Sequence, residues 1–224
     1  MKNHNQPQAG EFVRQMSVQR RQKAIRFYGM GLGCLIGGVL FLLIFKLSGI
    51  GLLFALVGGI ASYGFWQKGE YWMRRSEQAL MGAKAEQEVA VILNALSSKS
   101  SNHWQIEYNF PLKRWGDADV VLCSSEKNWY VVDVKSHKGK MINQDNRLKR
   151  VKGRRIYDFS EGDLLSKVRG QAADVARLKQ VRWVTPILCF TQAQVKIPRN
   201  QIDDVYIVEK TDLIRILEDL EKRL

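Results

Sequence analysis

Charged residues stand inside and at the ends of apolar runs that have the composition of β-strands. The run Val131–Val134 contains Asp133, and Lys135 follows it directly. Side chains alternate between faces along a strand, so Asp133 and Lys135 should point to the same side, about 6.6 Å apart. A charged pair on a buried strand is costly unless its members are paired or bind a metal ion. The pair alone is compatible with a structural salt bridge as well as with a metal site.

The apolar run before it begins with two more carboxylates, Asp117 and Asp119. A short loop separates this run from the strand of Asp133, which predicts an antiparallel hairpin. Such a hairpin brings the start of the first strand beside the end of the second. Carboxylates that converge there repel one another unless one is protonated or a cation lies between them. Because Mg²⁺ prefers oxygen ligands, a divalent cation among Asp117, Asp119 and Asp133 would relieve this repulsion.

Glu86 provides a third acid, from the helix that the apolar spacing predicts over residues 76–96. Val89 and Leu93 follow it at i+3 and i+7, so Glu86 should lie toward the packed side of that helix. Glu88, two residues away, should face water. An inward glutamate needs a partner, and a metal site would provide one.

Together these residues resemble the nuclease-related domain (NERD) family, within the wider PD-(D/E)XK nuclease-like superfamily. The resemblance covers roughly residues 78–195. It is carried by Gly82-x-x-Ala85-Glu86, Gly116-x-x-Asp119, Asp133-x-Lys135 with Gly139 after it, and Gln171-Ala172. The family usually has glycine where Ala85 stands and often glutamate where Asp133 stands. Neither departure removes a charge.

The resemblance implies hydrolysis of phosphodiester bonds in DNA or RNA, with Mg²⁺ (or Mn²⁺) as cofactor. Asp119 and Asp133 would hold the metal, and Glu86 would complete its shell directly or through water. Lys135 would orient or deprotonate the attacking water, and Gln171 would assist in positioning. The alternative is a non-catalytic domain of the same fold that tethers nucleic acid, or an adaptor domain, at a membrane.

A strongly basic stretch follows Lys135 and should border the site. Residues 138–155 contain one acid, Asp145, and these basic side chains: Lys138, Lys140, Arg147, Lys149, Arg150, Lys152, Arg154 and Arg155. Phosphate contacts from such a stretch give salt-dependent, sequence-independent affinity for nucleic acid. Anionic lipid is the alternative partner. His137 lies two residues beyond Lys135 and is a candidate for proton transfer, although a histidine in a loop more commonly has no role.

Two apolar segments precede this domain, at residues 27–45 and 47–66, and neither carries a charge. Each is long enough to cross a hydrocarbon core of about 30 Å, and the short break between them predicts a helical hairpin in a lipid bilayer. The net charge of +13 is partly explained by the flanks, since residues 1–26 hold six Lys/Arg and one acid. The positive-inside rule then predicts a multi-pass protein of the cell inner (cytoplasmic) membrane with both termini in the cytoplasm.

Small residues recur every fourth position in both apolar segments, at Gly29, Gly33 and Gly37 and at Gly51, Ala55 and Gly59. Such a row lets helix backbones approach closely. We expect it to pack the two helices of the hairpin together. The alternative is a homo-oligomer formed through these Gly-rich transmembrane faces.

The whole pattern predicts an α/β protein: a restriction-endonuclease-like mixed sheet flanked by helices and preceded by a two-helix transmembrane hairpin. We expect a basic cytoplasmic tail at 1–26, the hairpin at 27–66, a juxtamembrane linker at 67–77 and the nuclease-like domain at 78–224. Its expected strands are 104–110, 117–123, 129–135, 185–190 and 205–208, with an irregular hairpin at 138–155 and helices at 76–96, 163–181 and 211–224, the last capped by Thr211.

Overall fold

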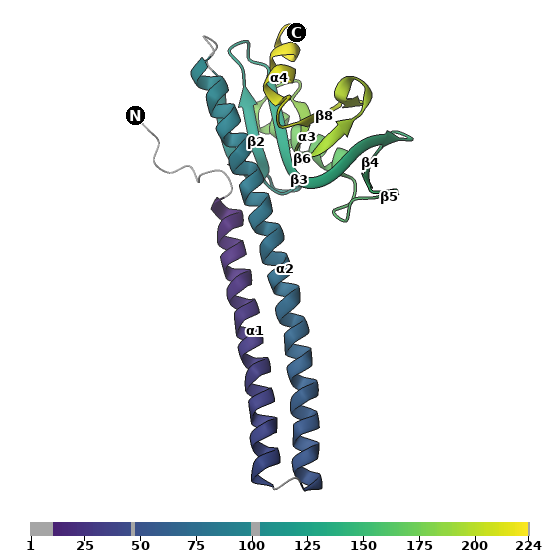
Figure 1. Ribbon diagram of the computed structural model, residues 1–224. Helices are drawn as coiled ribbons and strands as arrows, with labels where there is room; N and C mark the ends of the chain where they lie inside the picture. The colour runs from purple at the N-terminus through teal and green to yellow at the C-terminus, as the bar shows by residue number, and fades with distance from the viewer. Residues whose placement is uncertain (1–10, 46–47, 100–103, 224) are drawn as a thin grey trace, which may run out of the picture. The chain divides into compact units, whose positions relative to one another are not determined.

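The computed structural model describes residues 11–45, 48–99 and 104–223 (Figure 1). The chain forms two compact units, Phe12–Met81 and a second one that begins at Gly82. Helix α2 (Gly49–Lys99) is continuous and contributes residues to both.

The first unit consists of helix α1 (Glu11–Ile44) and the first part of α2, which pack against each other in antiparallel directions. Both helices contain a stretch that is long and apolar enough to cross a membrane. Most residues of these stretches are exposed, as expected for helices whose apolar surface contacts lipid. The predicted pair of packed apolar helices is therefore confirmed.

The two helices pack through only part of the rows that the four-residue spacing predicted. In α2, a Cβ on Gly51 would lie 3.3 Å from the Cα of Leu42, so this predicted position does face α1. A Cβ on Gly38 would lie 3.2 Å from the Cα of Ala55, and one on Gly58 would lie 2.8 Å from the carbonyl oxygen of Cys34. No described atom lies within 4 Å of a Cβ placed on Gly29, Gly33, Gly37 or Gly59. The prediction was therefore wrong for these four glycines, and it holds for Gly51 and Ala55 of α2. The glycines of α1 that contact α2 are Gly31 and Gly38, which are seven residues apart. The row of Gly29, Gly33 and Gly37 faces away from α2.

The basic segment before the first apolar run is helical from residue 11, and so is the expected linker at 67–77. The Ser76 hydroxyl donates to the carbonyl of Ser17 at 2.8 Å, and Arg20 donates to the carbonyl of Arg75 at 3.2 Å. No proline stands between residues 7 and 111, so neither helix meets a residue that must interrupt it. The first ten residues of the expected tail lie outside the described residues.

Within residues 104–223, eight strands form one mixed sheet in the order β1-β2-β3-β6-β8-β7, with β4 paired to β3 and β5 to β4. Strands β1, β2 and β3 are antiparallel, whereas β3, β6 and β8 are parallel. Their bounds are β1 (Gln105–Phe110), β2 (Ala118–Cys123), β3 (Trp129–Gln144), β4 (Arg147–Lys152), β5 (Arg155–Tyr157), β6 (Thr185–Lys196), β7 (Gln201–Ile202) and β8 (Val205–Glu209). The predicted mixed α/β sheet is confirmed.

Helices cover both faces of this sheet (Figure 1). Helix α3 (Leu164–Lys179) packs on the face that includes Val121 and Val131. The end of α2 and helix α4 (Leu213–Glu221) pack on the other face, which includes Val120 and Val132. Adjacent strand residues thus belong to different cores, as alternation requires. The two faces are called the α3 face and the α4 face below.

The expected element ends differ from the structure in a few places. Strand β3 continues to Gln144 instead of stopping at Lys135, because its second half is hydrogen-bonded to both β4 and β6. Helix α4 begins after Asp212, which makes no side-chain capping bond, so the predicted cap at Thr211 was wrong. The short helix η1 (Pro198–Asn200) and strand β7 were not predicted.

Candidate active site

The candidate site lies where β2 leaves β3. The two strands pair from Cys123 and Trp129 to Val120 and Val132. Strand β4 joins the same edge of β3 only from Lys140 onward. Between Val132 and Lys140, no described strand pairs with this edge. Gaps of this kind expose backbone groups that need other partners.

Asp119 fills the first position of this gap with its side chain. Its Oδ2 accepts a hydrogen bond of 2.6 Å from the backbone N–H of Val134, the residue after Asp133. The carboxylate therefore replaces a strand partner and is held next to Asp133. This confirms the expected approach of the two aspartates across the hairpin.

Asp133 is the most enclosed acid of the site, with 1% of its side chain exposed. Its Oδ1 lies 3.0 Å from the ammonium of Lys167, and its Oδ2 forms an ion pair with Lys135. Burial alone would raise the pKa of this carboxyl, but the two ammonium groups outweigh it and hold the pKa below its ordinary value. Asp133 is therefore ionised in the folded protein.

Asp119 has the opposite balance. Burial and, to a smaller extent, the neighbouring charge of Asp133 raise its pKa, and the net value is about 6. Lys135 and Lys167 and the bond from Val134 offset part of this effect. Two carboxylates with divergent pKa values are an arrangement found at acid–base and metal sites.

Lys135 stays protonated near neutral pH. Burial lowers the pKa of its ammonium, but Asp133 and Asp119 outweigh burial and raise it above the ordinary value. An amine that keeps its proton can bind and orient anions, but it cannot accept a proton from water. Two roles were expected for Lys135: to orient the attacking water or to remove a proton from it. The charged ammonium favours the first role and argues against the second.

Helix α3 adds two side chains one turn apart, Lys167 and Gln171. Asp163 begins this helix, as predicted, and its Oδ1 accepts from the N–H groups of Leu165 and Ser166 at 3.0 and 3.2 Å. Lys167 was missed by sequence reasoning. It stands four residues before Gln171, so the shared helix face was the signal that could have found it.

Gln171 is fully buried and anchors the start of β2. Its Nε2 donates to the carbonyl oxygen of Asp117 at 3.1 Å. Its Oε1 has no hydrogen-bond partner among the described residues. A buried acceptor without a donor is costly, so a water molecule held beside it would be stabilising. The Asp117 side chain itself is exposed, and its contribution to the site is its backbone carbonyl.

Glu86 is half-buried on α2, between core residues Ala85 and Val89 of the α4 face. In the described parts of the chain, no three His, Cys, Asp or Glu side chains are grouped so as to hold a metal ion. The structure thus joins Asp119, Asp133 and Lys135, and it does not group Glu86 with the two aspartates. Glu88, expected to face water, is partly buried and pairs with Lys210 at 2.6 Å.

The basic stretch forms an arm made of the second half of β3 with β4 and β5. Arg150 pairs with Met141, which belongs to the core of the α3 face. Alternation then places Arg150, Lys152 and Arg155 on the α3 face. Lys138, Lys140, Arg147 and Lys149 lie on the other face, and Arg154 lies in the turn between β4 and β5. The eight basic residues therefore do not form one surface.

His137 connects the site to this arm. Its Nε2 lies 3.2 Å from Oε1 of Glu161, and its Nδ1 lies 3.5 Å from Arg150. The ring also packs against Phe159, with 5.1 Å between centroids. Burial lowers the pKa of His137, and Arg150 adds to this effect while Glu161 opposes it.

Comparison with known proteins gives one match. Residues 81–191 match the family described as NERD, nuclease-related domain. No curated protein and no solved structure matches the chain. The matched range contains every residue of the candidate site, from Glu86 to Gln171.

Proposed function

The chain carries a nuclease-related domain over residues 81–191, and from this we propose that it is a metal-dependent nuclease that hydrolyses phosphodiester bonds in DNA or RNA. One observation supports this most: two adjoining carboxylates, Asp119 and Asp133, meet two lysines where β2 leaves β3. The reaction adds water across a phosphorus–oxygen bond. The water oxygen bonds to phosphorus, and the leaving oxygen takes up a proton.

The donor set fits Mg²⁺ or Mn²⁺. Asp119 and Asp133 offer hard oxygen ligands, and the unpartnered Oε1 of Gln171 can accept a hydrogen from a nearby water. These two aspartates would hold the ion, and Glu86, which the structure does not group with them, would take part only through water. When bound, the ion polarises the phosphoryl oxygen and lowers the pKa of bound water.

The remaining groups act on the substrate and the water. The Lys135 ammonium would bind a phosphate oxygen and offset its charge, since it keeps its proton. Lys167 would keep Asp133 ionised and in place. Gln171 would fix the start of β2, and therefore Asp119, through its bond to the Asp117 carbonyl.

Nucleic acid is the substrate class that the basic arm favours. Lys152 and Arg155 are cross-strand neighbours on the α3 face, the face to which the site carboxylates belong. Arg150 lies over the exposed ring of Tyr157, with its guanidinium carbon 6.0 Å from the ring centroid. Basic groups beside an aromatic ring suit a phosphate backbone with stacked bases.

A lipid bilayer is the proposed environment of the hairpin. The apolar stretches of α1 and α2 would cross the inner (cytoplasmic) membrane, with both termini in the cytoplasm. Cleavage would then be confined to nucleic acid that reaches the membrane surface.

A tether that binds nucleic acid without cutting is the second candidate. It is favoured by the complete pairing of Asp133 with two lysines and by the lack of a three-acid group in the described residues. Metal-dependent cleavage separates the two functions.

Lys135→Ala tests the proposal. The variant should lose cleavage by roughly a hundredfold or more, because it lacks the charge that stabilises the transition state, while binding changes little. Cleavage of labelled DNA and RNA by the full chain with Mg²⁺ or Mn²⁺ measures this, and excess chelator should stop the reaction. Lys196→Ala removes an exposed lysine from the end of β6 and serves as the control. Binding without cleavage in the wild type would establish the tether instead.

A further inference from the structure

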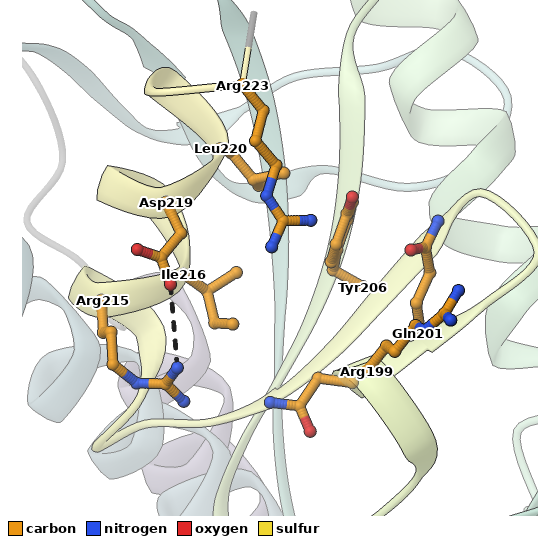
Figure 2. Close-up of a pocket in the computed structure, with 9 residues that line it drawn as sticks. Arg199, Gln201, Tyr206, Arg215, Ile216, Asp219, Leu220 and Arg223 are labelled. Atoms are coloured by element: carbon orange, nitrogen blue, oxygen red, sulfur yellow. Dashed lines mark ion pairs between the residues drawn. The ribbon is translucent and has the colours of Figure 1, made fainter.

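A cavity lies away from the candidate active site, between α4 and the η1–β7 segment (Figure 2). Its volume is about 560 Å³, which is in the range of small-molecule sites. Tyr206 of β8 lines the cavity and lies on the α4 face of the sheet. All residues that line the cavity follow residue 191, where the matched nuclease-related range ends. The site carboxylates belong to the α3 face, so the two sites are distinct.

The lining of this cavity is strongly basic. Arg215 and Arg223 approach it from the α4 segment, and Arg199 lies across from them (Figure 2). Arg215 is held by Asp212 at 3.0 Å and by Asp219 at 3.8 Å. Arg199 and Arg223 form no ion pair with any described residue. Two guanidinium groups thus remain available for an anion, and arginine matches phosphate oxygens well.

An apolar and aromatic surface lies beside these arginines. Ile216 and Leu220 are buried residues of α4 that line the cavity, and the half-buried ring of Tyr206 forms another part of its wall. A flat apolar group would be removed from water on this surface. The cavity therefore combines a place for a planar ring with a place for negative charge.

The backbone at the rim is strained. Arg199 and the next residue, Asn200, have φ values of +56° and +52°, in the left-handed region that L residues rarely adopt. Two such residues in succession cost free energy that the surrounding structure must offset, and they commonly occur at ligand sites. This conformation places Arg199 and Asn200 on the wall of the cavity.

We propose that this cavity binds a nucleoside phosphate. The base would lie against Tyr206, Ile216 and Leu220, and the phosphate oxygens would bind Arg199 and Arg223. This ligand could be a free nucleotide or the phosphorylated end of a nucleic-acid strand. The proposal does not depend on catalysis at Asp119 and Asp133.

Calorimetric titration of the full chain in detergent with ADP tests the proposal, with chelator present so that no hydrolysis occurs. Saturable binding at one site is expected. Arg199→Ala and Arg223→Ala should each weaken ADP binding by roughly tenfold or more, since each removes a charge-assisted hydrogen bond. Arg182→Ala is the matched control, because it removes an exposed arginine that belongs neither to the basic arm nor to the cavity, and its affinity for ADP should equal that of the wild type.

Three outcomes would overturn the proposal: no saturable binding, equal affinity in the two cavity variants and the wild type, or a loss confined to Arg182→Ala. Thermal unfolding of each variant checks that it is folded. Pyrophosphate should bind more weakly than ADP, and equal affinity would overturn the part played by the base. A 5′-phosphorylated oligonucleotide that displaces ADP would identify a strand end as the ligand, and failure to displace it would identify a free nucleotide.

Discussion

At the scale of single residues, the Asp133 carboxylate sets the electrostatics of the site. Its negative charge raises the pKa of Asp119 and of Lys135 in the same pocket. Lys167 and Lys135 keep this charge in place despite burial. Asp133 therefore stays ionised to a lower pH than an ordinary aspartate, whereas the pKa of Asp119 is raised to about 6.

Asp119→Asn should show how much the ionised Asp119 carboxylate destabilises the folded protein. The pKa of Asp119 is about 6 in the folded state against an ordinary value of 3.8, so the folded state binds more protons between these values. Stability must then fall as pH rises through this window. The wild type should lose stability relative to the variant from about pH 4 to about pH 6 and remain level above it.

Thermal unfolding of the metal-free full chain at a series of pH values measures this difference. The asparagine can still accept the bond from the Val134 N–H, so the variant keeps the local geometry. A pH-independent difference between the two proteins would show that Asp119 titrates as it does in the unfolded chain. A difference of the opposite sign would contradict the raised pKa.

The sequence was sufficient to predict that Asp119, Asp133 and Lys135 converge, because alternation and hairpin pairing are local rules. It was insufficient for Lys167, whose contact with Asp133 depends on how α3 crosses the sheet. The placement of Glu86 depends on the packing of α2 against the opposite face, which no local pattern determines.

At the scale of elements, the position of α3 depends on a glycine. A Cβ on Gly170 would lie 2.1 Å from the Trp115 indole, which packs against the helix at this point. Trp115 belongs to the loop before β2, so this contact and the Gln171 bond hold the same segment.

Gly170→Ala should therefore destabilise the domain by roughly 1–3 kcal/mol, because the indole must move. Chemical denaturation followed by tryptophan fluorescence measures this change. The control is the same substitution in a Trp115→Ala background, where alanine should be neutral or stabilise by up to about 1 kcal/mol through helix propensity. Equal losses in both backgrounds would assign the effect to the helix itself.

The arm also presents a test at this scale, since its strand register divides the basic residues between two faces. Lys152→Ala with Arg155→Ala should weaken nucleic-acid binding and lower the salt slope by roughly one to two. Lys140→Ala with Arg147→Ala removes the same charge from the other face and should have a smaller effect. Binding measured at several salt concentrations compares the pairs, and an unchanged slope in both would point to anionic lipid as the partner.

The antiparallel and parallel parts of the sheet could be predicted from apolar runs and loop lengths. The arm was predicted only as an irregular hairpin at 138–155, because β4 and the end of β3 are polar and are held by backbone pairing to their neighbours. Its division into two faces follows from the register, which depends on the turn at Asp145 and Asn146, both with positive φ.

At the scale of the whole molecule, the apolar helices predict a topology that can be measured. Protease added to inverted inner-membrane vesicles should release the domain of residues 82–224, and protease added to right-side-out vesicles should not. The basic residues flanking both apolar segments are the physical reason for this orientation. Release from right-side-out vesicles would contradict cytoplasmic termini, and release from unproteolysed membranes by high salt would contradict a lipid-embedded hairpin.

The presence of two long helices was evident from the uncharged segments, but their ends were not. Hydropathy indicates which part of a helix lipid can surround. It does not indicate where the helix ends, because a polar sequence can continue the helix, as residues 67–99 of α2 do. The direction in which glycines face also depends on the partner helix, so the spacing alone misplaced the packed row.

The lysine pairing of Asp133 has a consequence for how the protein matures. Proteins that concentrate unpaired acids at a metal site often need the ion in order to fold. Here Lys135 and Lys167 already compensate the buried charge, so the polypeptide can reach its native form during synthesis in ion-poor surroundings. Supply of the ion would then control when the molecule works, while leaving unaffected how much of it accumulates.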